Sequence, residues 1–102
     1  MNSYSEILFS GLNIENGLSN STVKTILQDY LGFMWFGTQD GLNRYDGYDF
    51  KIFRSDSEKS CHLSNNIVNV IFEDSSGVLW IGTDDGLNIY DRKMDNMKRV
   101  GI

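Results

Sequence analysis

The chain has 102 residues, a net charge of −5 and 40% hydrophobic residues, so it is long enough for one small domain and too apolar to be disordered. Its nine basic residues are scattered, which argues against a nucleic-acid partner because such partners require a clustered basic patch. No apolar run approaches the roughly 18 residues of a membrane-spanning helix, so this segment is expected to make no membrane contact. The opening MNSYSE lacks the basic and apolar regions of a signal peptide.

The only cysteine, Cys61, is followed by the only histidine, His62. One cysteine excludes an internal disulfide and a multi-cysteine zinc site. The Cys-His pair is a poor metal site, because adjacent side chains in an extended chain point in opposite directions. No nucleophile, base and carboxylate fall into a catalytic pattern, and we expect neither an enzyme nor a bound metal or cofactor.

Four short strands are predicted in chain order after a lead-in over residues 1–17. They alternate with glycine-containing turns such as Asp29–Gly32 and with the Asp-Gly pairs Asp40-Gly41 and Asp46-Gly47, where both residues tolerate positive φ. The four predicted strands are Thr22–Gln28, Phe33–Thr38, Leu42–Tyr45 and Tyr48–Arg54.

The same series returns further along the chain. Sixteen of the 29 residues from Leu18 to Asp46 recur, without a gap, 45 residues later. The second series of predicted strands is Ile67–Phe72, Val78–Thr83, Leu87–Tyr90 and Met94–Val100. Residues 5–12 align by the same offset with part of the fourth strand, and we expect them to form an extra outer strand.

Four antiparallel strands repeated at about 45 residues are typical of a β-propeller blade. We therefore expect an all-β chain in which residues 1–17 form an N-terminal outer strand and lead-in, 18–62 a first blade and 63–102 a second. Such sheets bury their faces against one another. The expected blade core comprises two tryptophans, two glycines that relieve crowding, two leucines and two tyrosines: Trp35, Trp80, Gly37, Gly82, Leu42, Leu87, Tyr45 and Tyr90.

Three motifs resemble the two-component regulator propeller repeat. The first copy reads LSNSTV at Leu18–Val23, DYLGFMWFGT at Asp29–Thr38 and DGLNRYD at Asp40–Asp46. The second copy reads DSSGVLWIGT at Asp74–Thr83 and DGLNIYD at Asp85–Asp91. The resemblance covers most of the chain.

The resemblance implies the periplasmic sensor region of a hybrid two-component histidine kinase that senses oligosaccharides derived from glycans. Under that interpretation this chain is an N-terminal part of the sensor, and the kinase lies elsewhere. Ligands of propellers usually bind to the loops that join strands, so these loops, including the link Asp56–Asn66, are candidate ligand contacts. Carboxylates in them can accept hydrogen bonds from sugar hydroxyls. The candidate ligand-binding residues in the hairpin loops are Gln39, Asp40, Asp84 and Asp85.

An alternative function is purely structural, with ligands contacting other blades. In either case an isolated pair of blades exposes two apolar faces and open edges, which promote association. We expect a homo-oligomer formed by head-to-tail stacking of blades, with three or four copies closing a ring.

Overall fold

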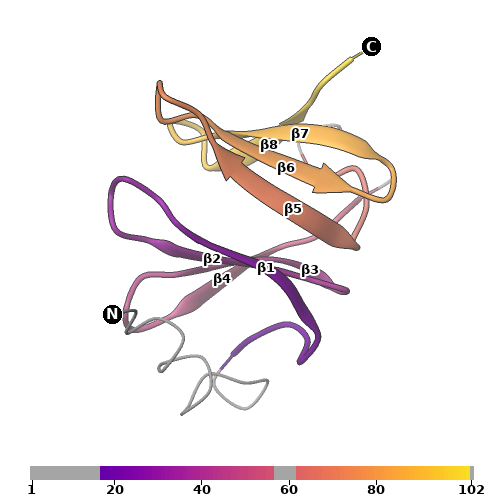
Figure 1. Ribbon diagram of the computed structural model, residues 1–102. Coiled ribbons are helices and arrows are strands. Elements are labelled where there is room, and N and C mark those ends of the chain that lie inside the picture. The colour runs from indigo at the N-terminus through magenta and orange to yellow at the C-terminus, as the bar shows by residue number, and fades with distance from the viewer. Residues whose placement is uncertain (1–16, 57–61, 102) are drawn as a thin grey trace.

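The computed structural model describes residues 17–56 and 62–101, which form two four-stranded antiparallel sheets (Figure 1). The predicted outer strand at residues 5–12 and Cys61 lie outside these ranges. Neighbouring strands along the chain are neighbours in each sheet. The first sheet comprises β1 (Val23–Gln28), β2 (Met34–Thr38), β3 (Gly41–Tyr45) and β4 (Phe50–Phe53). The second comprises β5 (Val68–Glu73), β6 (Leu79–Thr83), β7 (Gly86–Asp91) and β8 (Asn96–Arg99).

The described residues contain strands and turns but no helix, which confirms the all-β prediction. Among them there is accordingly no helix long and apolar enough to cross a membrane.

One turn and the fourth strands differ from the predictions. In the β2–β3 turn, Gly41 has a positive φ of 111° but Asp40 does not, so the turn residues are Gln39 and Asp40 and the left-handed glycine comes directly after them. The fourth strands are shorter than predicted. Before β4, the Asp46 Oδ1 atom accepts backbone N–H groups of Tyr48 and Asp49 at 2.8 and 2.9 Å, which holds them in the turn.

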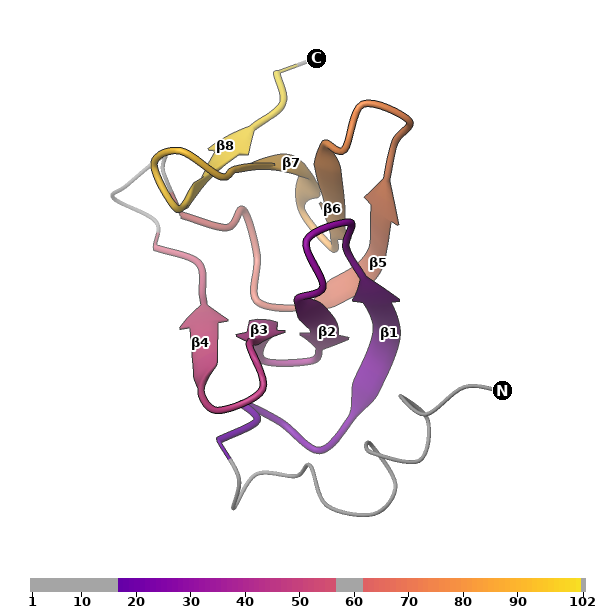
Figure 2. The same cartoon turned by 90° about the vertical axis from the view of Figure 1, so that its left-hand side faces the viewer.

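The two sheets stack face to face and enclose the main core (Figure 2). The first sheet contributes the Trp35 face, which we define by Trp35, Gly37, Leu42 and Phe53. The second contributes the Ile71 face, which we define by Ile71, Leu79, Ile81, Tyr90 and Met97.

Trp35 lies at the centre of this contact. It is fully buried. Its ring packs edge-on against Tyr90, with centroids 4.8 Å apart, and stacks on the Phe53 ring with centroids 5.8 Å apart. A Cβ atom on Gly37 would lie 2.6 Å from the Val68 Cγ1 atom, so glycine at this position is what allows the sheets to approach.

The outward faces of the two sheets are covered to different extents. On the first sheet, the Ile26 face (Val23, Ile26, Met34, Phe36, Tyr45 and Phe50) has a small core of its own, in which Phe36, Met34 and Leu18 are buried. On the second, we define the Trp80 face by Val70, Phe72, Trp80, Gly82 and Leu87. Val70 is 51% and Phe72 is 59% exposed.

Trp80 differs from its counterpart in the first sheet. Sequence analysis places both tryptophans between blades, but only Trp35 lies there, whereas Trp80 is half-buried on a face that no described sheet covers. Of the other predicted core residues, Leu42, Gly37 and Tyr90 are buried. The half-buried ones are Tyr45, Leu87 and Gly82.

Candidate functional site

Several polar residues of the repeated motifs serve the scaffold. In the first sheet the Asn43 side chain is fully buried, accepts the Ser19 backbone N–H at 2.9 Å and donates to the Ser19 Oγ atom at 2.8 Å. The Thr38 hydroxyl donates to the Gly41 carbonyl at 2.9 Å and closes the hairpin. The second sheet repeats these contacts with Asn88, Ser64, Thr83 and Gly86. These residues are used inside the fold and are not free for a ligand.

The repeated Asp-x-x-Gly-x-x-Trp spacing has a similar explanation. Asp29 is buried, and its Oδ1 atom accepts the backbone N–H groups of Leu31 and Phe33, both at 3.0 Å. Its Oδ2 atom accepts the Trp35 indole N–H at 2.8 Å. Burial raises the pKa of the Asp29 carboxyl, but these hydrogen bonds and the Arg92 guanidinium outweigh it and hold the pKa below its usual value. The aspartate therefore shapes the turn and orients the tryptophan.

The predicted ligand residues lie in the β2–β3 and β6–β7 turns. The Asp40 carboxylate pairs with Arg54 at 3.2 Å, with both side chains nearly half exposed. Gln39 is exposed beside it, and Asp84 and Asp85 are exposed in the corresponding turn of the second sheet.

A polar chain at this end of the sheets crosses from one sheet to the other. The Lys24 ammonium at the start of β1 donates to the Asn69 Oδ1 atom at the start of β5, at 2.5 Å. The Asn69 Nδ2 atom then donates to the Asp84 Oδ1 atom at 2.7 Å. All three side chains belong to exposed residues. The predicted residues Asp84 and Asp85 thus adjoin the sheet-to-sheet contact, and sequence analysis missed Lys24 and Asn69.

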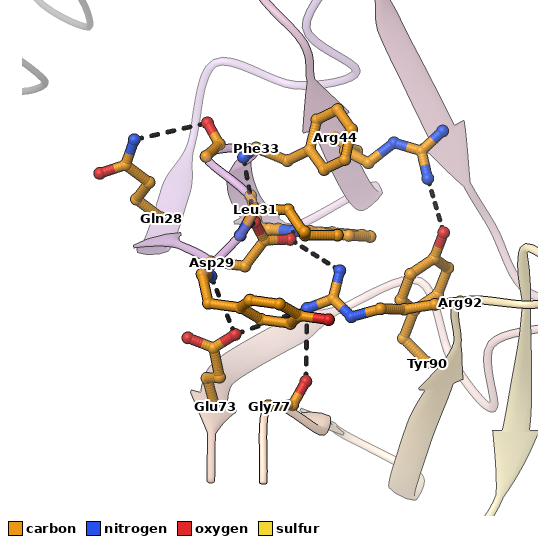
Figure 3. Close-up of polar contacts among 12 residues, drawn as sticks. Gln28, Asp29, Leu31, Phe33, Arg44, Glu73, Gly77, Tyr90 and Arg92 are labelled. Carbon is orange, nitrogen blue, oxygen red and sulfur yellow. Dashed lines mark hydrogen bonds and ion pairs between the residues drawn. The ribbon is translucent and has the colours of Figure 1, made fainter. Parts of the chain in front are cut away.

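A second polar cluster lies at the opposite end, where the β1–β2 turn meets the second sheet (Figure 3). Arg92 is its centre. It donates to Asp29 Oδ2 at 3.0 Å, to Glu73 Oε2 at 3.5 Å and to the Gly77 carbonyl at 3.4 Å. Its guanidinium also lies 4.8 Å from the centroid of the Tyr30 ring, within range of a cation–π contact.

Beside it, Asp95 gathers three partners. Its carboxylate accepts hydrogen bonds from Arg44 at 2.9 Å, from the Tyr90 hydroxyl at 2.6 Å and from the Lys51 ammonium. Partial burial raises the pKa of Asp95, but Lys51, Tyr90 and Arg44 outweigh it and lower the pKa to about 2. Burial and the bond to Asp95 raise the pKa of Tyr90 to about 12. Since Arg44 and Lys51 belong to the first sheet and Asp95 to the second, this cluster fastens the sheets together.

Neither cluster is arranged as a metal site, since the described ranges hold no group of three or more His, Cys, Asp or Glu side chains close enough for one. His62 lines a groove of about 480 Å³ between β4 and β8, together with Lys51, Arg54 and Asp95.

Most of the missed residues share a signal in the sequence. Arg92 and Arg44 stand where the other copy of the repeat has Gly47 and Ile89. Asp95 has no counterpart, because the β7–β8 turn is two residues longer than the β3–β4 turn, whereas Lys51 corresponds to Lys98. A charge difference or an inserted residue therefore marks three of these four residues, whereas the identical positions build both sheets.

Comparisons with known proteins identify similar sequences and structures. The family described as Two component regulator propeller matches residues 17–40 and 62–85. The histidine kinase P4 of Formosa agariphila is 44% identical over 59 residues, a match that covers 58% of this chain and 4% of the kinase.

A solved structure is similar over most of the chain. It is the extracellular domain of a chain assigned to a hybrid two-component system from B. thetaiotaomicron, with 35% identity and a TM-score of 0.77. The match covers 88% of this chain and 13% of that chain. The chain thus spans only a small part of either relative.

Proposed function

Because the chain carries two blades of the two-component regulator propeller type, we propose that it serves ligand sensing on the extracytoplasmic side of a hybrid two-component histidine kinase. The blades themselves are non-catalytic, and phosphoryl transfer belongs to other domains. The ligand in this proposal is an oligosaccharide released from a glycan, and the compartment is the periplasm. The extracellular origin of the structural relative supports the location.

The proposed ligand site rests on the hydrogen-bonded series Lys24–Asn69–Asp84. This series connects the two sheets at the end where Asp40 and Asp85 also lie. Ammonium, amide and carboxylate groups together supply donors and acceptors for sugar hydroxyls. Because these side chains are exposed, they exchange bonds to water for bonds to a ligand. The proposed contacts are therefore Lys24, Gln39, Asn69 and the three turn aspartates Asp40, Asp84 and Asp85.

A ligand bound here contacts both sheets at once. Binding then favours whichever relative arrangement of the sheets lets Lys24 and Asn69 reach the same sugar. A signal follows only if that arrangement binds the ligand more tightly than the alternative, because a ligand with equal affinity for both shifts neither population. The Arg44 and Lys51 contacts to Asp95 at the opposite end of the same interface would respond to such a shift.

Isothermal titration calorimetry against a panel of oligosaccharides, neutral and uronic, tests the proposal. We expect one glycan class to give saturable heat, and Asn69→Ala and Asp85→Ala to abolish it. Lys93→Ala, an exposed change in the β7–β8 turn, is the matched control and should bind like the wild type. Binding that survives both site substitutions would place the ligand elsewhere.

The alternative, a purely structural segment, is favoured by one observation. The serine, threonine and asparagine side chains of the repeated motifs make their hydrogen bonds inside the fold. A panel in which no glycan gives heat would support this alternative and contradict the sensing proposal for these two blades.

A further inference from the structure

The Trp80 face is an open apolar groove. Its volume is about 480 Å³, and the Val70, Phe72, Trp80 and Leu87 side chains line it together with Gly82 and Asp74. Exposed apolar surfaces of this kind on a sheet are typical of association sites.

The contact between the two sheets within the chain serves as a template for what fits there. On the Trp35 face, the Val68 side chain fills the space left by the missing side chain of Gly37, which we call the notch above this glycine. Tyr90 packs edge-on against Trp35. The Trp80 face carries the same residues 45 positions later. Gly82 stands for Gly37, Trp80 for Trp35 and Leu87 for Leu42, whereas among the described residues only Val70 of the same sheet lies within 4 Å of a Cβ atom placed on Gly82.

The partner side of the template is also present in the chain. The second sheet covers the Trp35 face through Val68, Ile71 and Tyr90, and the Ile26 face has Val23, Ile26 and Tyr45 at the corresponding positions. Each of these three pairs is identical. Ile26 is 40% exposed, and Val23 and Tyr45 are half-buried, so they remain accessible although Phe36 beneath them is buried.

We propose that a second copy of this chain docks its Ile26 face onto the Trp80 face of the first. In this joint the Val23 side chain of one copy fills the notch above Gly82 of the other, and Tyr45 packs against Trp80. This inference rests on the internal repeat and is independent of any sugar ligand.

The positions that differ between the repeats support the same occupant. Within the chain, Arg44 and Asp95 form an ion pair at 2.9 Å across the sheets. In the proposed joint the apolar Ile89 takes the place of Arg44, and no residue takes the place of Asp95, because the β3–β4 turn is two residues shorter than the β7–β8 turn. A change on one side alone would leave a charge facing an apolar group, whereas a change on both sides keeps the joint complementary.

One contact of the template is lost in the proposed joint. The counterpart of Arg92 is Gly47, so the Asp74 carboxylate gains no ion pair from the second copy. The joint between copies is therefore weaker than the contact within the chain. Because each copy has one Trp80 face and one Ile26 face, the contact is heterologous, and copies add head to tail until a ring closes.

Sedimentation velocity over a range of micromolar concentrations tests the joint with one variant for each face. Gly82→Val fills the notch, and because the added Cβ meets only the half-exposed Val70 side chain, at 2.7 Å, the fold can adapt. Ile26→Glu places a charge on the other face. Tyr48→Ser, at a 90% exposed turn residue outside both faces, is the matched control. Far-ultraviolet circular dichroism checks that each variant is folded.

We expect the wild type and the Tyr48→Ser control to form species of two or more copies and both single variants to be monomers. A one-to-one mixture of the two variants should form a dimer, because each supplies the face that the other lacks. Phe72→Glu replaces Gly82→Val if the latter does not fold.

Three results would overturn the proposal. A monomeric wild type would show that the faces do not bind each other. Association of the Ile26→Glu variant at wild-type strength would show that two Trp80 faces pair symmetrically. A mixture that stays monomeric would exclude the head-to-tail joint. None of these results bears on the glycan titration, which reports the other site.

Discussion

Arg92 lies 63 residues after Asp29, yet its Nη1 atom donates to the Asp29 Oδ2 atom at 3.0 Å across the two sheets. The Asp29 side chain is fully buried, and the same oxygen also accepts the Trp35 indole N–H. The ion pair therefore connects the turn of one sheet, the central tryptophan and the other sheet. Because the acid is desolvated, its partner matters more than it would at the surface.

Replacing Arg92 should destabilise the fold more than replacing an exposed arginine. Arg92→Ala removes the cation beside a buried carboxylate, and we expect the free energy of unfolding to fall by about 2–3 kcal/mol. Arg54→Ala, which breaks the nearly half-exposed pair with Asp40, should cost less than about 1 kcal/mol. Urea denaturation followed by tryptophan fluorescence measures both, and equal losses would contradict the role given to the buried pair.

The two tryptophans should differ although their local motifs are the same. Trp35→Ala empties the centre of the core between the sheets and should cost about 3–5 kcal/mol. Trp80→Ala removes a half-buried side chain and should cost about half as much or less when the protein is monomeric. Thermal unfolding at low protein concentration makes the comparison. A larger loss for Trp80→Ala would show that the Trp80 face is covered in the monomer.

The two repeated glycines give a third matched pair. A Cβ atom at position 37 would lie 2.5 Å from the Thr25 Cγ2 atom as well as 2.6 Å from Val68, and both neighbours are held between the sheets. Gly37→Ala should therefore cost about 1–3 kcal/mol through overpacking. Gly82→Ala should cost less, because its neighbour Val70 is half exposed and no second described sheet holds it in place. Chemical denaturation of both variants decides, and a cost at Gly82 equal to that at Gly37 would be inconsistent with an open notch.

The strands and their turns follow from local sequence, which is why they are predictable. Runs rich in β-branched and other apolar residues specify β1 and β5, and glycine with positive φ specifies turns such as the one at Gly32. The repeat adds the stacking, because two copies of one sheet present related faces to each other.

The polar clusters around Arg92 and Asp95, where the two sheets meet, are not predictable in the same way. Arg92 and Asp95 meet Asp29 and Arg44 only after the sheets stack, and the repeat draws attention to identical residues rather than to these differing ones. The unequal burial of the tryptophans has a similar cause. A tryptophan is fully buried only if another sheet packs on its face, and the motif, which is the same in both copies, does not determine whether one does.

Asp95 provides a fourth prediction, on acid stability. It has a left-handed backbone with φ of 54°, which aspartate and asparagine tolerate better than most residues, so Asp95→Asn keeps the turn while removing the charge. The folded-state pKa of about 2 lies below the usual 3.8. Ionisation therefore stabilises the fold fully above about pH 4, and this contribution is lost as the pH falls toward 2.

The expected size of this contribution follows from the pKa shift and the exposure. A lowering from 3.8 to about 2 would correspond to roughly 2.5 kcal/mol, but 37% of the Asp95 side chain is exposed, so screening by solvent leaves about 1 kcal/mol. Asp95→Asn should be less stable than the wild type by this amount at pH 6 and nearly as stable at pH 2. Urea denaturation curves across this range measure the gap, which added salt should narrow at pH 6. A gap that stays constant down to pH 2 would mean that the Asp95 charge does not fasten the sheets together.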